Sequence, residues 1–120
     1  MCGTFGLHMN ILYVEWRDCV SLDLVSQKET LAYIRQGDTV VIDLREFQYY
    51  AKRHIPGAIS MPYEYFNENH PVFRQYGIII LCCERGATSL NIGRKLSEKN
   101  YKVFSLAGGM ESWRGPTISG

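Results

Sequence analysis

Two continuous runs rich in β-branched, mostly apolar residues dominate the pattern of hydrophobic and polar positions along the chain. They are Thr39–Asp43 and Ile78–Cys82. A strand that is buried on both faces has no polar side, so its sequence shows a continuous apolar run instead of an alternation. The two runs therefore predict strands in the interior of a parallel sheet.

Shorter apolar runs predict the remaining strands, and segments with helical periodicity lie between them. The further strands are expected over 20–25, 59–61 and 102–106. Longer helices are expected over 27–36 and 88–100. Shorter helical turns are expected over 47–53, 63–67 and 109–113, with a loop around 69–71. A further edge strand over 11–16 is left open.

Local signals define the first helix most clearly. Ser26 and Glu29 have the spacing of a capping box, and Gly37 suits the left-handed position after the last turn. The apolar positions expected to be buried in the two longer helices are Leu31, Ile34, Leu90, Ile92 and Leu96. Met110 and Trp113 are also expected in the core.

Strands that alternate with helices indicate an α/β fold, with a central parallel sheet covered by helices on both faces. In such sheets ligands bind at the carboxyl ends of the strands. A functional site is therefore expected just after one of the buried strands.

The length and charge of the chain narrow the class of protein. The 120 residues fit one domain, expected over 19–116, with an N-terminal extension over 1–18 and a short tail over 117–120. A formal net charge of +1 argues against a broad electrostatic surface for nucleic acid or an anionic membrane. Residues 1–14 lack a basic segment and are too short to span a bilayer, so we expect a soluble cytoplasmic protein.

The chain contains four cysteines: Cys2, Cys19, Cys82 and Cys83. The last two are neighbours on a strand, where consecutive side chains point to opposite faces, so they are poorly placed to bond each other. No cysteine or histidine spacing is typical of a zinc site. We therefore expect reduced thiols, no metal and no cofactor.

Cys83 is the candidate nucleophile. It follows a buried strand and precedes a helix, where backbone N–H groups converge and the helix N-terminus carries partial positive charge. Both effects favour the thiolate, which is the reactive form. The alternative is a buried cysteine that only packs, since free cysteine is among the most buried residue types.

Four segments in register resemble the rhodanese-like (sulfurtransferase) domain family. They are Val41-Ile42-Asp43-Leu44-Arg45-Glu46, His54-Ile55-Pro56-Gly57-Ala58-Ile59, Cys83-Glu84-Arg85-Gly86-Ala87-Thr88-Ser89, and Leu106-Ala107-Gly108-Gly109-Met110 with Trp113. The resemblance implies that the loop opening with Cys83 is the active-site loop. It also implies a reaction in which this cysteine takes the outer sulfur of thiosulfate or a persulfide and passes it to a thiol, cyanide or a protein acceptor.

The residues after Cys83 are expected to bind the substrate. They are Glu84, Arg85, Gly86, Ala87, Thr88 and Ser89. Gly86 allows positive φ, and successive amides can form an anion-binding nest. Arg85 suits an anionic donor, whereas Glu84 opposes one and is expected to face solvent or pair with Arg85. Thr88 and Ser89 are expected either to donate hydrogen bonds to sulfur or to cap the helix.

Two other functions stay open. The first is a sulfur-relay or binding module that depends on a partner protein. The second is a phosphatase or arsenate reductase, a class of relatives whose loop tends to be one residue longer. Asp43, Arg45 and His54 are expected to fix the structure, so no Cys–His dyad is predicted and the backbone must activate Cys83.

Overall fold

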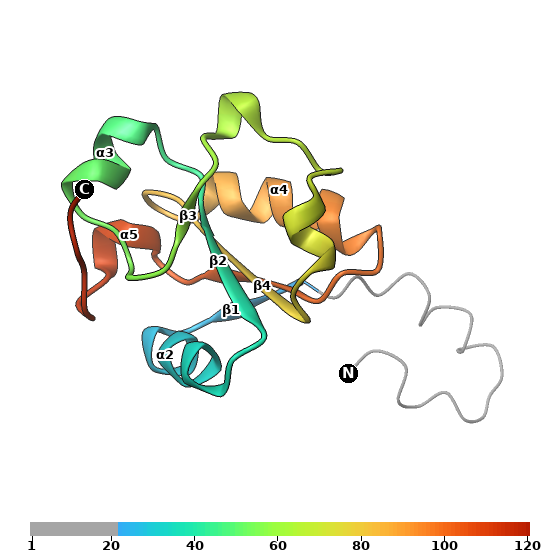
Figure 1. The fold of residues 1–120 in the computed structure, drawn as a ribbon, viewed down its shortest axis with the longest axis horizontal. Coiled ribbons are helices and arrows are strands. Elements are labelled where there is room, and N and C mark those ends of the chain that lie inside the picture. The colour runs from blue at the N-terminus through green and yellow to red at the C-terminus, as the bar shows by residue number, and fades with distance from the viewer. Residues whose placement is uncertain (1–21) are drawn as a thin grey trace, which may run out of the picture.

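The computed structural model describes residues 22–120, which form one parallel sheet with helices on both faces (Figure 1). The strand order is β1-β5-β4-β2-β3, and every neighbouring pair is parallel. The strands are β1 (Leu22–Val25), β2 (Thr39–Asp43), β3 (Ile59–Ser60), β4 (Ile78–Cys82) and β5 (Val103–Leu106). The predicted α/β fold class is confirmed.

The predicted helices are present, with small shifts at their ends. They are α2 (Gln27–Gln36), α3 (Phe47–Lys52), α4 (Ala87–Ser97) and α5 (Gly109–Ser112), with 3₁₀ turns η1 (Tyr63–Tyr65) and η2 (Pro71–Arg74). The capping box of α2 is confirmed, because Ser26 and Glu29 each accept the other's backbone N–H. Gly37 follows this helix with a φ of 87°.

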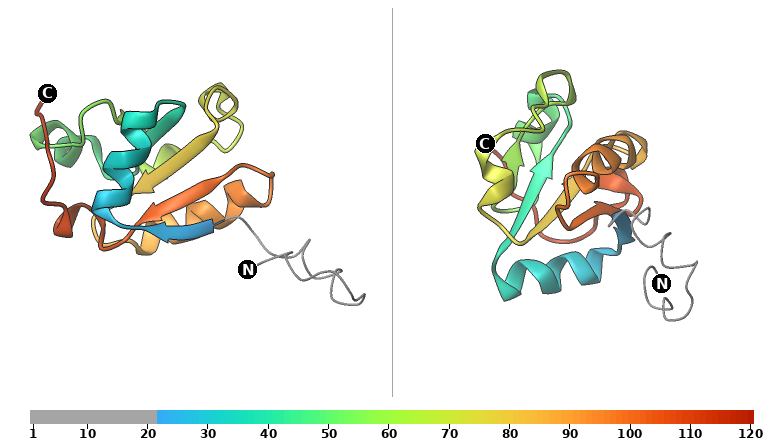
Figure 2. Two further views of the ribbon diagram at one scale, coloured as in Figure 1. Left: turned by 90° about the horizontal axis from the view of Figure 1, so that it is seen from below. Right: turned by 90° about the vertical axis from the view of Figure 1, so that its right-hand side faces the viewer.

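The two interior strands supply most of the core. Val40, Ile42, Ile79 and Leu81 lie on one face and pack against α4 and η2. Val41 and Ile80 lie on the other face with the partly buried side chains of α2 and with α5 (Figure 2). This alternation follows from the pleat of a strand. Met110 and Trp113 are buried on the second face, as predicted.

The prediction for Leu90 is wrong, because its side chain is 40% exposed. Ile92 and Leu96 are buried, and the other buried positions of α4 are the small residues Ser89, Gly93 and Ser97. Residues four apart lie on one helix face, whereas Leu90 is rotated away from Ile92 by about 200°. A Cβ at Gly93 would lie 2.6 Å from Leu22 Cδ1, so the helix packs closely on β1 there.

Several boundaries also differ from the predictions, and α4 ends at Ser97 instead of residue 100. Helix α4 begins at Ala87 with Gly86 as its N-cap, and no side chain caps it, so capping by Thr88 or Ser89 is wrong. The turn predicted over 63–67 ends at Tyr65, and η2 begins at Pro71 within the predicted loop. His70 Nδ1 accepts the Val72 N–H and thereby caps η2.

The C-terminal residues pack against the domain. Ile118 and His54 exchange two backbone hydrogen bonds of 2.9 Å, and Gly120 N donates to Ala51 O. Predictions for the N-terminal extension, for an edge strand over 11–16 and for Cys2 and Cys19 lie outside the described residues. Over residues 22–120, no helix is long and apolar enough to cross a bilayer.

Candidate active site

Cys83 lies directly after β4, at the carboxyl end of an interior strand, and is 5% exposed. Its Sγ accepts hydrogen bonds from the backbone N–H groups of Gly86, at 3.1 Å, and Ser89, at 3.3 Å. The loop that follows Cys83 therefore curls back so that two amides point at the sulfur. Such amides stabilise negative charge on a thiolate, and the N-terminus of α4 adds to the effect.

Gly86 makes this curl possible. Its φ of 110° lies in the region that L side chains rarely adopt, and a Cβ there would meet no atom closer than 3.9 Å. The need for glycine is therefore conformational rather than a matter of space. The positive φ turns the loop so that the Gly86 amide faces the sulfur while α4 begins at the next residue.

Ser89 is buried beneath the sulfur and joins two layers of the site. Its Oγ lies 3.5 Å from Cys83 Sγ, 3.0 Å from the Gly86 carbonyl and 2.6 Å from Ser105 Oγ. Ser105 is itself fully buried in β5. The hydroxyl pair thus connects the neighbouring strand to the Cys83 loop, a role for Ser105 that sequence reasoning missed.

The first turn of α5 supports the loop from behind. Met110 N donates to Cys83 O at 2.8 Å, and Glu111 N donates to Glu84 O at 2.9 Å. Gly109, with a φ of 62°, allows this approach, since its Cβ would lie only 2.5 Å from Glu84 O. The sequence signal was the Gly108-Gly109 pair, which was interpreted only as the start of a helical turn.

Asp43 and Arg45 form the expected ion pair. Arg45 donates from Nε to Asp43 Oδ1 at 3.0 Å and from Nη2 to Oδ2 at 2.9 Å, and both side chains are nearly inaccessible. Burial lowers the pKa of Arg45, but the hydrogen bond and charge of Asp43 outweigh it, so this pKa is raised. Arg45 Nη1 also lies 3.7 Å from Glu84 Oε1. The Glu84 side chain is 55% exposed, so the expectation that it faces solvent is confirmed, whereas the alternative pairing with Arg85 is wrong because Arg85 binds Glu111.

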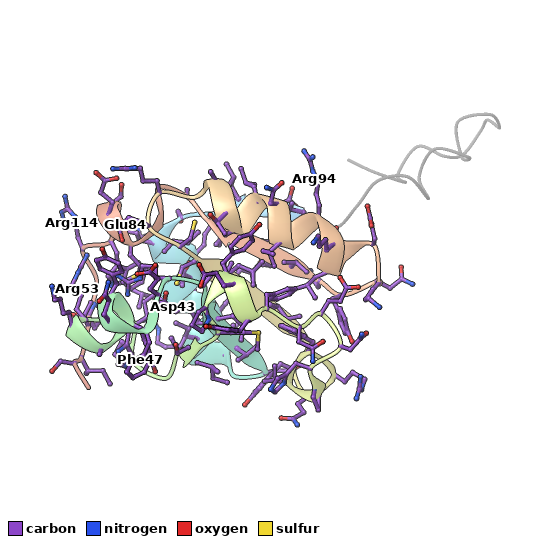
Figure 3. All side chains as sticks on the ribbon, turned by 90° about the horizontal axis from the view of Figure 1, so that it is seen from above. Asp43, Phe47, Arg53, Glu84, Arg94 and Arg114 are labelled. Carbon is purple, nitrogen blue, oxygen red and sulfur yellow. The ribbon has the colours of Figure 1, made fainter. Side chains whose placement is uncertain are left out.

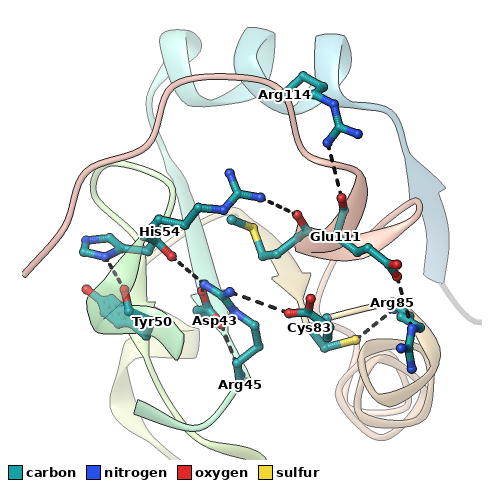
Figure 4. A network of polar contacts seen from close by, with 12 residues as sticks. Asp43, Arg45, Tyr50, His54, Cys83, Arg85, Glu111 and Arg114 are labelled. Carbon is teal, nitrogen blue, oxygen red and sulfur yellow. Dashed lines mark hydrogen bonds and ion pairs between the residues drawn. The ribbon is translucent and has the colours of Figure 1, made fainter. Parts of the chain in front are cut away.

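A chain of polar contacts extends from this pair toward α5. Arg45 Nη2 donates to the Arg53 carbonyl, and Arg53 Nη2 donates to Met110 O, both at 2.7 Å. Figure 3 shows Arg53, Asp43 and Glu84 toward the same end of the domain, and Figure 4 shows the polar contacts there from close by. His54 Nδ1 lies 2.8 Å from Tyr50 O, so it satisfies a backbone group, as expected, and does not contact Cys83.

A pocket of about 370 Å³ opens above Cys83. Of the loop residues proposed from sequence, Glu84 and Thr88 line it with Cys83. Gly86 and Ser89 are buried behind the sulfur and Ala87 is exposed. Arg85 is 79% exposed and its Nε donates to Glu111 at 3.1 Å, so it does not line the pocket.

Residues outside the loop complete the pocket, and sequence reasoning missed several of them. Arg45, with its neighbours Leu44 and Glu46, follows β2, while Tyr49 comes from α3 and Tyr63 from η1. Only the fold brings these segments to the carboxyl ends of β2 and β4. Ligands bind at the carboxyl ends of the strands in a parallel sheet. Applying this rule to the residues after β2, as well as to those after β4, would have predicted the residues that follow β2.

Cys82 lies on the opposite face of the sheet and plays no part in the pocket. It is fully buried among apolar side chains, and burial together with the charge of Asp43 raises the pKa of its thiol well above the usual value. Both described cysteines are free thiols. A buried, protonated thiol is chemically inert, so the two adjacent cysteines have different properties.

Comparisons with known proteins agree with this geometry. The chain is 36% identical over 78 residues to a tRNA sulfurtransferase of Desulfurococcus amylolyticus. The matched region covers 65% of the chain and 15% of that protein. It is 26% identical over 91 residues to the thiosulfate sulfurtransferase GlpE of Coxiella burnetii, covering 75% of the chain and 85% of GlpE. A thiosulfate sulfurtransferase structure from Pseudomonas aeruginosa matches with a TM-score of 0.68 at 25% identity, over 82% of the chain and 19% of that protein.

The family model for the rhodanese-like domain matches residues 26–116, which include strands β2 to β5, the Cys83 loop and α5. The match therefore covers every element that builds the pocket. On this evidence, the chain belongs to the family of rhodanese-like domains.

Proposed function

We propose that the protein is a sulfurtransferase that carries a sulfane sulfur on Cys83. The observation that supports this most directly is the pair of backbone hydrogen bonds, from Gly86 and Ser89, to a sulfur at the floor of an open pocket. The names of the relatives point to the same chemistry.

The reaction divides into two displacements at sulfur. In the first, the Cys83 thiolate attacks the outer sulfur of a donor, and the donor's S–S bond breaks. Its electron pair leaves with the rest of the donor, as sulfite from thiosulfate or as a thiolate from an organic persulfide. In the second, a thiol or cyanide attacks the outer sulfur of the Cys83 persulfide and restores the thiolate.

The contacts around the sulfur suit both steps. The thiolate and the terminal persulfide sulfur are anions, and the amides of Gly86 and Ser89 are fixed in position before reaction. Among the described histidines, His54 and His70 both contact backbone groups instead of Cys83. Activation by the loop amides therefore needs no histidine base.

Phosphoryl transfer fits the site less well. A phosphate carries charged oxygens that need several donors, and a guanidinium is the preferred partner. Arg85 instead binds Glu111 outside the pocket, and Glu84 lies at the pocket wall where it would repel a phosphate dianion. These contacts favour sulfur donors over aryl phosphates.

Mass spectrometry after donor treatment tests the proposal. Incubation with thiosulfate or an organic persulfide should add one sulfur atom to the peptide that contains Cys83, removable by cyanide or a reductant. Cys83→Ser should abolish the transfer and leave the fold intact. Sulfur found only on other cysteines, or turnover retained in Cys83→Ser, would reject this mechanism. Cys83-dependent hydrolysis of an aryl phosphate without sulfur uptake would support the phosphatase alternative.

A catalytic thiol must remain reduced between turnovers. We therefore also propose that the protein acts in the cytoplasm, where thiols are kept reduced.

The same experiment with purified protein distinguishes an autonomous enzyme from a partner-dependent relay. Turnover with small donors and acceptors alone supports the enzyme, whereas loading of Cys83 without release to a small thiol supports the relay.

A further inference from the structure

The pocket above Cys83 has an unusual charge balance for a site that receives anionic sulfur donors. Of the charged side chains that line it, Arg45 is the single cation and Glu46 and Glu84 are the anions. The guanidinium of Arg45 is already occupied, because it binds both carboxylate oxygens of Asp43 and the Arg53 carbonyl. Its remaining nitrogen faces Glu84 at 3.7 Å.

Arg85 does not correct this balance. Its side chain points to solvent, 79% exposed, and is neutralised by Glu111. Figure 4 shows that this ion pair lies on the α5 side of the loop, separate from Arg45. The pocket lining therefore holds two acidic residues and no free cation among the described residues that line it. Glu46 Oε1 accepts a hydrogen bond from the neutral Gln48 amide, which leaves its charge in place, so the lining favours a negative potential.

The walls of the pocket are aromatic. Tyr49 from α3 and Tyr63 from η1 both line it, and their side chains are 47% and 52% exposed. The face of an aromatic ring attracts a cation, and its apolar surface binds a hydrocarbon chain. A volume of about 370 Å³ also falls in the size class of organic ligands.

We propose that the sulfur partner of this site is an aliphatic thiol, with its persulfide, that carries a positive charge close to the sulfur. The inference rests on the proposed sulfurtransferase function and names the class of substrate. The positive group would lie between the tyrosine rings and the carboxylates of Glu46 and Glu84. Thiosulfate, a dianion, is a poor match for the same pocket.

The transfer itself needs no further reactant. The acceptor loses its proton to water and attacks, as a thiolate, the outer sulfur of the Cys83 persulfide. The bond between that sulfur and Cys83 Sγ breaks, and its electron pair stays on Sγ, where the Gly86 and Ser89 amides hold it. A new S–S bond forms on the acceptor, so atoms and electrons balance. The reverse reaction loads Cys83 from the cationic persulfide.

The test uses thiols of similar size and different charge. Cys83 is first loaded with inorganic polysulfide, and loading is verified by mass spectrometry. Loss of the persulfide is then timed with cysteamine, which is cationic, 2-mercaptoethanol, which is neutral, and mercaptoacetate, which is anionic. A second arm compares short peptides in which cysteine is flanked by lysines or by glutamates, and so separates a small thiol from a thiol on a basic protein.

The key measurement is the ratio of the cysteamine rate to the mercaptoacetate rate. It should fall by about tenfold in Glu46→Gln/Glu84→Gln relative to the unmodified protein, as expected for two partly screened charges. Intrinsic thiol reactivity cancels in this comparison. Glu68→Gln/Glu98→Gln makes the same change in net charge at residues outside the pocket lining, and its ratio should stay unchanged.

The outcomes are distinct. A charge preference that does not change in the pocket variant in either arm, or that changes equally in the control, overturns the inference while leaving the sulfurtransferase intact. Failure of polysulfide to load Cys83 removes the proposed function and this inference with it. A charge effect in the peptide arm alone keeps the inference and identifies the partner as a protein thiol.

Discussion

Replacing Gly109 with alanine should destabilise the protein and impair the Cys83 loop together. A Cβ at this position would lie 2.5 Å from Glu84 O and 2.6 Å from Cys83 O. Both atoms belong to the backbone of the Cys83 loop, so the clash cannot be relieved by rotating a side chain. The φ of 62° adds conformational strain of about 1 kcal/mol for a residue that has a Cβ.

Relief of the clash would require α5 to move away from the loop. Two hydrogen bonds would be lost, from Met110 N to Cys83 O and from Glu111 N to Glu84 O. Each contributes on the order of 1 kcal/mol. The two lost hydrogen bonds and the strain at the positive φ of the substituted residue would together lower the free energy of unfolding by about 2–4 kcal/mol. The clash is not added to this sum, because the movement of α5 that breaks the hydrogen bonds also removes the clash.

Gly37→Ala is the matched control. Gly37 also has a positive φ, of 87°, but nothing lies within 4 Å of its Cβ position. Its φ of 87° and ψ of 178° lie in a region that almost only glycine adopts, so Gly37→Ala should cost about 1–3 kcal/mol through strain alone and leave sulfur uptake unchanged. Urea unfolding gives the two free energies, and mass spectrometry gives the rate of sulfur addition to Cys83. The reasoning is refuted if Gly109→Ala lowers the free energy of unfolding by less than about 1 kcal/mol, or if it loads sulfur at the unmodified rate.

Three further predictions concern the core and the reactivity of the thiols. At neutral pH an alkylating reagent should leave Cys82 unmodified in the folded protein, because its raised pKa keeps it protonated; peptide mapping that finds it labelled would contradict this. Arg45→Met should destabilise by about 3–5 kcal/mol, since it leaves the Asp43 carboxylate buried without its partner; urea unfolding that finds less than 1 kcal/mol would be inconsistent. Ile92→Ala should cost about 2–5 kcal/mol and Leu90→Ala about 0.5 kcal/mol, and thermal unfolding that reverses this order would reject the described packing of α4.

The sequence by itself determined the features that depend on neighbours along the chain. The apolar runs of β2 and β4, and the capping box of α2, depend only on residues within one segment, so their patterns predicted them correctly. The same holds for the position of Cys83 between a buried strand and a helix. Hydrophobic periodicity was less decisive for α4, where small residues provide the close contact and Leu90 faces solvent.

The tertiary structure decided every contact that joins distant segments. Arg85 binds Glu111, and Glu84 faces Arg45, because α5 and the end of β2 come to the same edge of the sheet as β4. No local pattern fixes which of several charged side chains meet there. The charge balance of the pocket depends on those pairings. Only the fold could establish this balance, because the energy between two charges depends on their distance in space and not on their spacing along the chain.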